Sequence, residues 1–376
     1  MDFLNLGSVL LEVAKPKGMW EYLIFGLESL VKNYGLTIIL ITLAIKLVML
    51  PFDFYNRYIN KRNSYKMAEI QPELTKIQAK YGNNKEALNQ KTMEVYKRHN
   101  YNIMGSCGGM LINMALTMVI FFTLFSGLNK IASYKIYTEY NTLQQTYTEA
   151  LGGENSRLIT TTAEDGTSTV SIQILDAEGN VLSTNAISKE DDARASQIVV
   201  TKYGEIKESF LWIKNIWRPD TNASVVLSYK DFKNNAKKYI TEDDYFNDAI
   251  YNQVISSIKD SKEYSGNNGY YILIVLAALT TYLSTQVTVW IGKAKAKKNN
   301  KPYVDAMSQN KVLVYMMPII MALFTLFYNA MFAIYIVTGA VFGLLTGPLM
   351  TMVVDKVFDK SIKKEQEKTK VSYSRK

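Results

Sequence analysis

Long apolar blocks alternate with strongly charged segments along this chain. A run of about 20 apolar residues suffices to cross the ~30 Å hydrocarbon core of a bilayer. Three blocks have about this length: residues 35–55, 104–128 and 269–291. A fourth block, 312–354, carries no charge and would measure ~65 Å as one helix at ~1.5 Å per residue. It therefore predicts two spans, 312–328 and 330–354, with a turn near Tyr328-Asn329. The pattern indicates an all-α polytopic membrane protein with five transmembrane helices.

The charged segments between these blocks predict the orientation of the chain. Residues 56–103 hold ten Lys and Arg against four Glu, and the loop 292–311 and the tail 355–376 are also basic. Short segments rich in Lys and Arg stay on the cytoplasmic side of a membrane. Two predicted spans separate each consecutive pair of basic segments, so all three can be cytoplasmic together. The N-terminus and residues 129–268, with 15 Lys and Arg against 20 Asp and Glu, are then outside a bacterial cell membrane, and the C-terminus is cytoplasmic.

The cytoplasmic segment 56–103 has the pattern of a helical hairpin. Apolar residues recur at helical spacing on a first arm that ends near Tyr81, residues 82–84 favour a turn, and a second arm runs to about His99. Pro72, early in the first arm, predicts a kink or a fresh helix start. The apolar stripe is narrow, so we expect the two arms to pack mainly on each other.

Two stretches outside the spans have patterns of their own. Residues 1–34, which we expect to be retained, contain an amphipathic helix at about 19–33. Its place directly before a span favours the membrane interface, although a soluble amphipathic helix has the same pattern. In the extracellular segment 129–268, alternation on both sides of residues 176–180 predicts a β-hairpin. The aromatic cluster at 210–217 fits an interfacial belt or the small core of this segment equally well.

Composition excludes several kinds of chemistry. The chain has one cysteine, Cys107, and one histidine, His99, among its 376 residues. A disulfide within the chain needs two cysteines. One cysteine and one histidine are too few for the usual zinc sites, and they leave a single candidate base for a His-based triad. We therefore expect no metal, no cofactor and no enzyme activity. The formal net charge of +9 marks topology and attraction to anionic lipids, because the sequence carries no nucleic-acid recognition motif.

Polar side chains within the apolar blocks are the candidate functional residues. A lysine inside a span costs roughly 2.5–3.5 kcal/mol on insertion scales. The Lys46 ammonium either snorkels to the nearer interface or faces a wet cavity inside the bilayer. A water-filled groove between the spans would also satisfy polar groups on the other helices. The candidate groove residues are Lys46, Asn113, Thr117, Thr281, Thr285 and Tyr335. The alternative for the hydroxyl stripe that begins at Thr281 is bonding to carbonyls of its own helix.

A series of short motifs runs through the chain in a fixed order. They are Asn33 to Leu36 with Ile45 to Pro51, then Gln71, Pro72, Glu73, Lys80 and Tyr81, then Cys107, Phe210-Leu211-Trp212, Thr280 to Leu283, Met316 to Ile319, and Tyr335. Together they resemble the YidC/Oxa/Alb3 family of membrane protein insertases. The resemblance covers roughly residues 19–128, 205–220 and 269–355. It leaves out about 140–204 and 221–268, to which no role is assigned.

The resemblance implies a five-helix insertase core with a hydrophilic groove open to the cytoplasm and to lipid. It implies insertion of nascent membrane proteins, alone or with the Sec translocon, by a monomer that contacts the ribosome through its basic tail and loops. Within the cytoplasmic hairpin it assigns recruitment to Gln71, Pro72, Glu73, Lys80 and Tyr81.

This sequence departs from the family at several groove positions. The family usually carries arginine at the position of Lys46 and glutamine at that of Asn113. Lysine keeps the positive charge but lacks the bidentate fork and the fixed protonation of arginine.

Two other functions fit a charged residue in a span. A small transporter or channel subunit would use Lys46 as a binding charge and would favour internal repeats and broken helices, which the sequence lacks. An intramembrane hydrolase would need a serine within hydrogen-bond reach of Lys46. Ser106 and Ser284 lie at nearby depth, but neither sits in a nucleophile motif. The insertase is therefore the first hypothesis.

Overall fold

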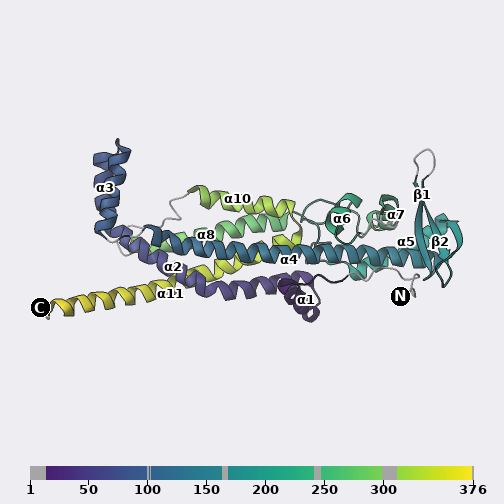
Figure 1. Ribbon diagram of the computed structural model, residues 1–376, viewed down its shortest axis with the longest axis horizontal. Coiled ribbons are helices and arrows are strands. Elements are labelled where there is room, and N and C mark those ends of the chain that lie inside the picture. The colour runs from purple at the N-terminus through teal and green to yellow at the C-terminus, as the bar shows by residue number, and fades with distance from the viewer. Residues whose placement is uncertain are drawn as a thin grey trace. The chain divides into compact units, whose positions relative to one another are not determined.

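The computed structural model describes residues 14–99, 101, 103–162, 168–240, 247–298 and 311–374. Most of these residues are helical (Figure 1). The elements in chain order are α1 (Met19–Val31), α2 (Tyr34–Tyr81), α3 (Lys85–Arg98), α4 (Ile103–Gly152), β1 (Ser156–Thr162), β2 (Ser168–Leu175), β3 (Val181–Ala186), α5 (Lys189–Ile206), α6 (Tyr229–Ala236), α7 (Asp248–Asp260), α8 (Ile272–Lys298), α10 (Lys311–Phe327) and α11 (Ala330–Ser374).

The chain divides into two compact units. Unit 1 comprises Met1–Ile38, Thr123–Ile274 and Thr325–Ile334. Unit 2 comprises Ile39–Phe122, Val275–Phe324 and Tyr335–Lys376. Unit 2 therefore contains most of the apolar helical segments and the basic hairpin, and unit 1 contains α1 and the segment between the second and third predicted spans.

The expected all-α polytopic fold is confirmed in outline. Within the described residues, four helices are long and apolar enough to cross a membrane: α2, α4 from Ala115, α8 and α11. The fourth predicted span, 312–328, corresponds to the shorter apolar helix α10. The break between α10 and α11 falls at residues 328–329, where the turn was predicted.

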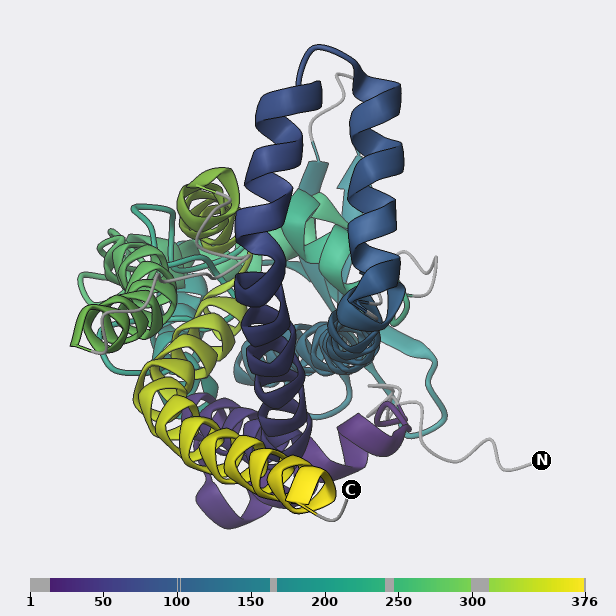
Figure 2. The same ribbon diagram turned by 90° about the vertical axis from the view of Figure 1, so that its left-hand side faces the viewer.

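The basic hairpin forms as the sequence pattern predicts. Helix α2 continues beyond the first apolar block to Tyr81, and α3 runs beside its final turns (Figure 2). The Asn84 side chain accepts a hydrogen bond from the Ala87 backbone N–H and caps α3. Ile70 and Val95 are almost completely buried, so the narrow apolar stripe does close the hairpin.

Pro72 differs from the expectation of a fresh helix start. It lies inside α2, whose helical assignment is continuous from Tyr34 to Tyr81. A proline inside a helix removes one backbone hydrogen bond and costs roughly 3 kcal/mol. The buried apolar contacts of the hairpin, two residues before Pro72 at Ile70, offset part of this cost.

In unit 1, α4 does not end where the second apolar block ends. It continues about 24 residues beyond position 128, to Gly152, which is ~36 Å at ~1.5 Å per residue. The buried side chains on this extension recur at helical spacing: Ile131, Ala132, Ile136, Tyr137, Tyr140, Leu143, Gln144, Tyr147 and Thr148. The extension is therefore an amphipathic helix around which the rest of unit 1 folds.

The predicted β-hairpin is confirmed, and it belongs to a three-stranded antiparallel sheet of order β1-β2-β3. The turn between β2 and β3 is stabilised by Asp176, whose carboxylate accepts hydrogen bonds from the backbone N–H groups of Glu178 and Asn180. Gly179 has φ of 85°, a conformation that favours glycine. Strand β1 and helix α5, neither of which was predicted, complete this region.

The two segments outside the family resemblance fold together. Helix α7, from the second segment, packs on α5 and on strands β1 and β2, from the first (Figure 1). Tyr140 on α4, Phe232 on α6 and Tyr251 on α7 form an aromatic cluster with ring centroids 4.7 to 4.9 Å apart. These elements form one lobe, the described residues of 129–268, here called the outer lobe for the side of the membrane on which the sequence predicts it.

The aromatic cluster at 210–217 contributes to the core of unit 1, as one of its two interpretations predicts, and its place at a membrane interface stays a prediction. Ile213, Ile216 and Trp217 are buried, and the Trp217 ring lies 5.0 Å from that of Tyr34. Leu211, in contrast, is 74% exposed. The inner part of the cluster is thus core, and its tip remains a candidate for the membrane interface.

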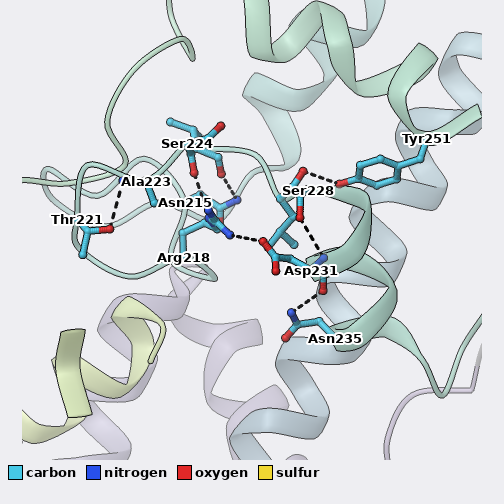
Figure 3. Close-up of polar contacts among 11 residues, drawn as sticks. Asn215, Arg218, Thr221, Ala223, Ser224, Ser228, Asp231, Asn235 and Tyr251 are labelled. Atoms are coloured by element: carbon cyan, nitrogen blue, oxygen red, sulfur yellow. Dashed lines mark hydrogen bonds and ion pairs between the residues drawn. The ribbon is translucent and has the colours of Figure 1, made fainter. Parts of the chain in front are cut away.

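The segment after this cluster is a hydrogen-bonded hub of unit 1. Asn215 donates to the Val225 carbonyl, and Arg218 bonds the Ser224 carbonyl and forms an ion pair with Asp231 at 3.2 Å (Figure 3). The Asp231 backbone N–H donates a hydrogen bond to the Ser228 hydroxyl, which caps the start of α6 (Figure 3). These bonds tie the segment before residue 220 to the start of α6.

Residues 221–268, the second segment outside the family resemblance, begin and end at neighbouring positions of the backbone. The Tyr271 N–H donates to the Asp220 carbonyl at 3.0 Å, and the Gly269 N–H donates to the Thr221 carbonyl at 2.8 Å. The Asp220 side chain is completely buried and accepts bonds from the N–H groups of Tyr270 and Leu273. Asp220 therefore closes the base of this segment and caps the start of α8.

Candidate substrate groove

A small cavity surrounds Lys46 within unit 2. Its volume is about 40 Å³, and a buried water needs roughly 10–15 Å³ by this measure, so the cavity has room for about three waters. The described residues that line it are Thr42, Ile45, Lys46, Met49, Asp53, Thr117, Ile120 and Tyr335. They come from α2, α4 and α11, which are three of the membrane-length helices.

The α2 residues of the cavity share one helical face. Thr42, Lys46, Met49 and Asp53 follow the spacing of i, i+4, i+7 and i+11, which places side chains above one another. On the opposing helix α11, a Cβ added to Gly339 would lie 3.2 Å from the Lys46 Cε. The absent side chain of Gly339 therefore leaves room for the lysine stem.

The surroundings of the Lys46 ammonium favour a wet cavity over a snorkelling side chain. Lys46 is half-buried, and no described side chain forms a hydrogen bond or an ion pair with it. An ammonium in a low-dielectric region needs water or a ligand in place of such partners. The role of Lys46 in handling a substrate stays a prediction.

The other candidate groove residues divide into three groups. Thr117 and Tyr335 line the same cavity as Lys46. Thr281 and Thr285, on α8, are not among the described residues of that cavity, and the Thr285 hydroxyl donates to the Thr281 carbonyl at 2.9 Å. This is the alternative in which hydroxyls bond their own helix. The Asn113 side chain lies outside the described part of the chain.

Asp53 is a cavity residue that the sequence interpretation missed. It lies in the first apolar block, seven residues after Lys46, and lines the same cavity. The signal was present, because an acidic residue in a span is as costly as a basic one and calls for the same explanation.

A charge cluster around the buried Asp355 joins the middle of α2 and of α11 to the last turn of α8 in unit 2. Asp355 is 4% exposed and forms ion pairs with Lys61 at 3.0 Å and Lys295 at 2.5 Å. Phe358, one turn further along α11, contacts the rings of Tyr58 and Tyr65 on α2. The start of the basic tail is thus fixed to the base of the hairpin.

The predicted recruitment residues lie on the hairpin, and some of them connect its arms. Glu73 accepts hydrogen bonds from Arg98 at 2.6 Å and bonds His99 at 3.1 Å. The bond to His99 and the charge of Arg98 hold the pKa of the Glu73 carboxyl below its usual value. The Lys80 ammonium lies 5.4 Å from the centre of the Tyr81 ring. Glu73 therefore has a structural role whether or not it also contacts a partner.

Helix α1 buries Glu21 and Ile24 and leaves several of its large apolar side chains exposed. Its charged residues face α4, where Glu21 pairs with Lys130 at 3.0 Å and Glu28 pairs with Lys135. The exposed large apolar side chains of α1 are Met19, Tyr22, Leu23 and Leu30, the last of them 80% exposed. Such an arrangement suits a helix that lies in the membrane interface.

These features define a class: a multi-pass membrane protein with a charged cavity between apolar helices. The chain matches the family described as 60Kd inner membrane protein over residues 26–357. It belongs to that family, which is the YidC/Oxa family of the resemblance above.

Several curated relatives are similar to part of the chain, and each is named Membrane protein insertase YidC. The protein of Fusobacterium nucleatum is 36% identical over 112 residues, which are 30% of this chain and 53% of that protein. The protein of Clostridium perfringens is 38% identical over 108 residues, 29% of this chain and 42% of that protein. The protein of Anaeromyxobacter dehalogenans is 33% identical over 118 residues, which are 31% of this chain and 20% of that protein. The chain thus spans about half the length of these relatives or less.

Proposed function

We propose that this chain is a membrane protein insertase. The observation that carries the proposal is the cavity around Lys46, in which a cation without a described protein partner sits between apolar helices of a YidC/Oxa family member. Three relatives that share a third or more of the matched residues bear the insertase name. The substrates are nascent membrane proteins.

The mechanism follows from the cost of taking a hydrophilic segment through hydrocarbon. A wet cavity shortens the apolar path that the segment crosses. The Lys46 ammonium attracts acidic residues of the segment, since opposite unit charges ~4 Å apart gain about 4 kcal/mol at an effective dielectric constant near 20. The apolar part of the substrate then moves sideways into lipid, where burial of its surface is favourable.

The basic segments supply the remaining contacts of the proposal. The hairpin and the tail are cytoplasmic and meet the ribosome, the Sec translocon or anionic lipids, and the outer lobe is extracellular. The exposed apolar side of α1 lies at the outer membrane surface. The chain works as a monomer. The basic composition of the hairpin, the loop and the tail supports this orientation.

Replacement of Lys46 tests the cavity directly. We expect Lys46→Ala to reduce insertion of a client with a short acidic outer tail about five- to tenfold, which corresponds to roughly 1–1.4 kcal/mol, and Lys46→Arg to retain insertion. The assay is insertion into proteoliposomes that contain the purified chain. Lys259→Ala, on the exposed side of α7, is the matched control. An unchanged yield with Lys46→Ala would remove Lys46 from the mechanism.

Deletion of the hairpin tests recruitment. Replacing residues 60–98 with a short Gly-Ser linker should abolish insertion of clients while the apolar helices still integrate. Integration is measured by protease protection of the outer lobe, and insertion is measured in the same membranes. Full insertion by the shortened chain would show that the hairpin is dispensable.

The rival functions receive less support from the geometry. The Ser284 hydroxyl donates to the Thr281 carbonyl at 2.9 Å and is not among the described residues of the Lys46 cavity, which disfavours a Ser–Lys hydrolase. Site-specific photocrosslinking from position 46 to a stalled nascent chain separates the insertase from both a hydrolase and a transporter.

A further inference from the structure

Asp53 places a negative charge in the cavity that holds Lys46. Both residues line it, and the Asp53 side chain is half-buried. Seven residues of α-helix separate them by ~10.5 Å along the axis and return almost to the same face. The cavity therefore offers two opposite charges at two depths.

The Asp53 carboxylate is not consumed by a salt bridge within the protein. No ion pair joins Asp53 to Lys46 or Arg57 among the described side chains, although the charges of Asp53 and Arg57 do attract each other at longer range. Arg57, one turn further along α2, donates instead to the Thr351 hydroxyl at 3.2 Å. No group of three or more metal-ligating side chains exists in the described part of the chain, so Asp53 is not part of a protein metal site there.

We propose that Asp53 binds a lysine or arginine side chain of the incoming polypeptide while Lys46 binds an acidic one. The proposal rests on the insertase function above. A carboxylate that is partly removed from water gains from an organic cation that replaces its lost hydration. An inorganic divalent cation is usually held by several carboxylate or carbonyl oxygens, and Asp53 is the one carboxylate among the described residues of the cavity.

The order of the two charges matches the charge order of a client under the proposed orientation. The first span runs inward, so Asp53 is nearer the cytoplasm than Lys46. In a client whose N-terminal tail points outward, the residue that meets Asp53 therefore follows the residue that meets Lys46. A distance of ~10.5 Å is about three residues of extended chain at ~3.3 Å each. The cavity thus favours a client with an acidic residue followed by a basic residue about three positions later.

The test uses two clients that differ at one position. Both carry an aspartate in a short outer tail, followed three residues later by lysine in one and by glutamine in the other. Proteoliposomes contain the full chain as wild type, Asp53→Asn, Asp53→Glu or Asp53→Lys. Asp359→Asn, an exposed carboxylate on α11, is the matched control.

We expect the wild type to insert the lysine client about fivefold better than the glutamine client, a difference of roughly 1 kcal/mol. Asp53→Asn should bring this ratio to about one, Asp53→Glu and Asp359→Asn should keep it, and Asp53→Lys should bring it below one. A ratio that Asp53→Asn leaves at its wild-type value would overturn the proposal, because a purely structural role lowers both yields together. Insertion of neither client above protein-free vesicles would refute the insertase function itself.

Discussion

Asp220 offers the sharpest test of how unit 1 is held together. Its carboxylate is completely buried and accepts three hydrogen bonds. The donors are the backbone N–H groups of Leu273 at 2.6 Å and Tyr270 at 2.7 Å, and the indole N–H of Trp212 at 3.3 Å. One side chain thus joins the aromatic segment, the base of the outer lobe and the first turn of α8.

The magnitude follows from these bonds. A hydrogen bond to a charged group contributes about 1.5–3 kcal/mol, and a buried donor left unpaired adds a penalty. The two short bonds alone predict that Asp220→Ala destabilises unit 1 by roughly 4 kcal/mol. Asp220→Asn keeps one acceptor oxygen but turns an amide toward a backbone N–H, so we expect roughly 2 kcal/mol. A shift of about 3 °C per kcal/mol for a unit of this size gives losses of ~12 and ~6 °C in Tm.

Intrinsic tryptophan fluorescence during a thermal scan measures this effect. Trp212 and Trp217 both lie in the segment that Asp220 secures, among four tryptophans in the chain. The purified protein is scanned in nanodiscs, with Asp248→Asn as the matched control. Asp248 is exposed in the first turn of α7, and surface substitutions of this kind stay within about 0.5 kcal/mol. A Tm for Asp220→Ala within ~2 °C of the wild type would refute the assignment of Asp220 as a stabilising clamp.

Two further substitutions test unit 1. A Cβ at Gly35 would lie 2.3 Å from the Phe210 ring, so Gly35→Ala should cost about 1–3 kcal/mol through overpacking, and Phe210→Leu in the same chain should recover part of it in the thermal scan. Burial, followed by the charge of Glu208, raises the pKa of Glu139 from 4.5 to about 8. The folded state therefore holds more protons than the unfolded state between these values, and stability falls as the pH rises through this window, by at most ~1.4 kcal/mol per pH unit. Glu139→Gln should flatten that slope in unfolding measured from pH 5 to 8, and an unchanged slope would contradict the buried carboxyl.

The local patterns of the sequence predicted the elements that depend on neighbouring residues. The hairpin turn at 82–84, the break at 328–329 and the β-turn at 176–180 all follow from short-range chemistry, and the structure contains each of them. The extension of α4 was missed because its buried stripe mixes tyrosines and polar residues, such as Tyr137, Gln144 and Thr148, with a few aliphatic ones, so it does not stand out as an apolar helical face.

What required the structure were contacts between residues far apart in the chain. Strand β1 contains no turn signal of its own and is defined by pairing with β2. For the candidate site, Lys46, Thr117 and Tyr335 were each recognisable as polar residues in a span, but only the structure places them on one cavity. Asp53 joins them there because helix geometry brings it to the face of Lys46.

The hydrogen-bonded ends of the segment 221–268, at Asp220 and Tyr271, have a consequence for protein engineering and for the evolution of this chain. The backbone at Asp220 is hydrogen-bonded to the backbone at Tyr271, so the two ends of the intervening stretch lie side by side. That stretch can therefore change in length without moving the aromatic segment before it or helix α8 after it. A reporter domain spliced between residues 222 and 268 would need only a short linker at each junction. The same geometry lets a lineage gain or shed this module in a single genetic event, provided that the tyrosine faces it covers are repacked.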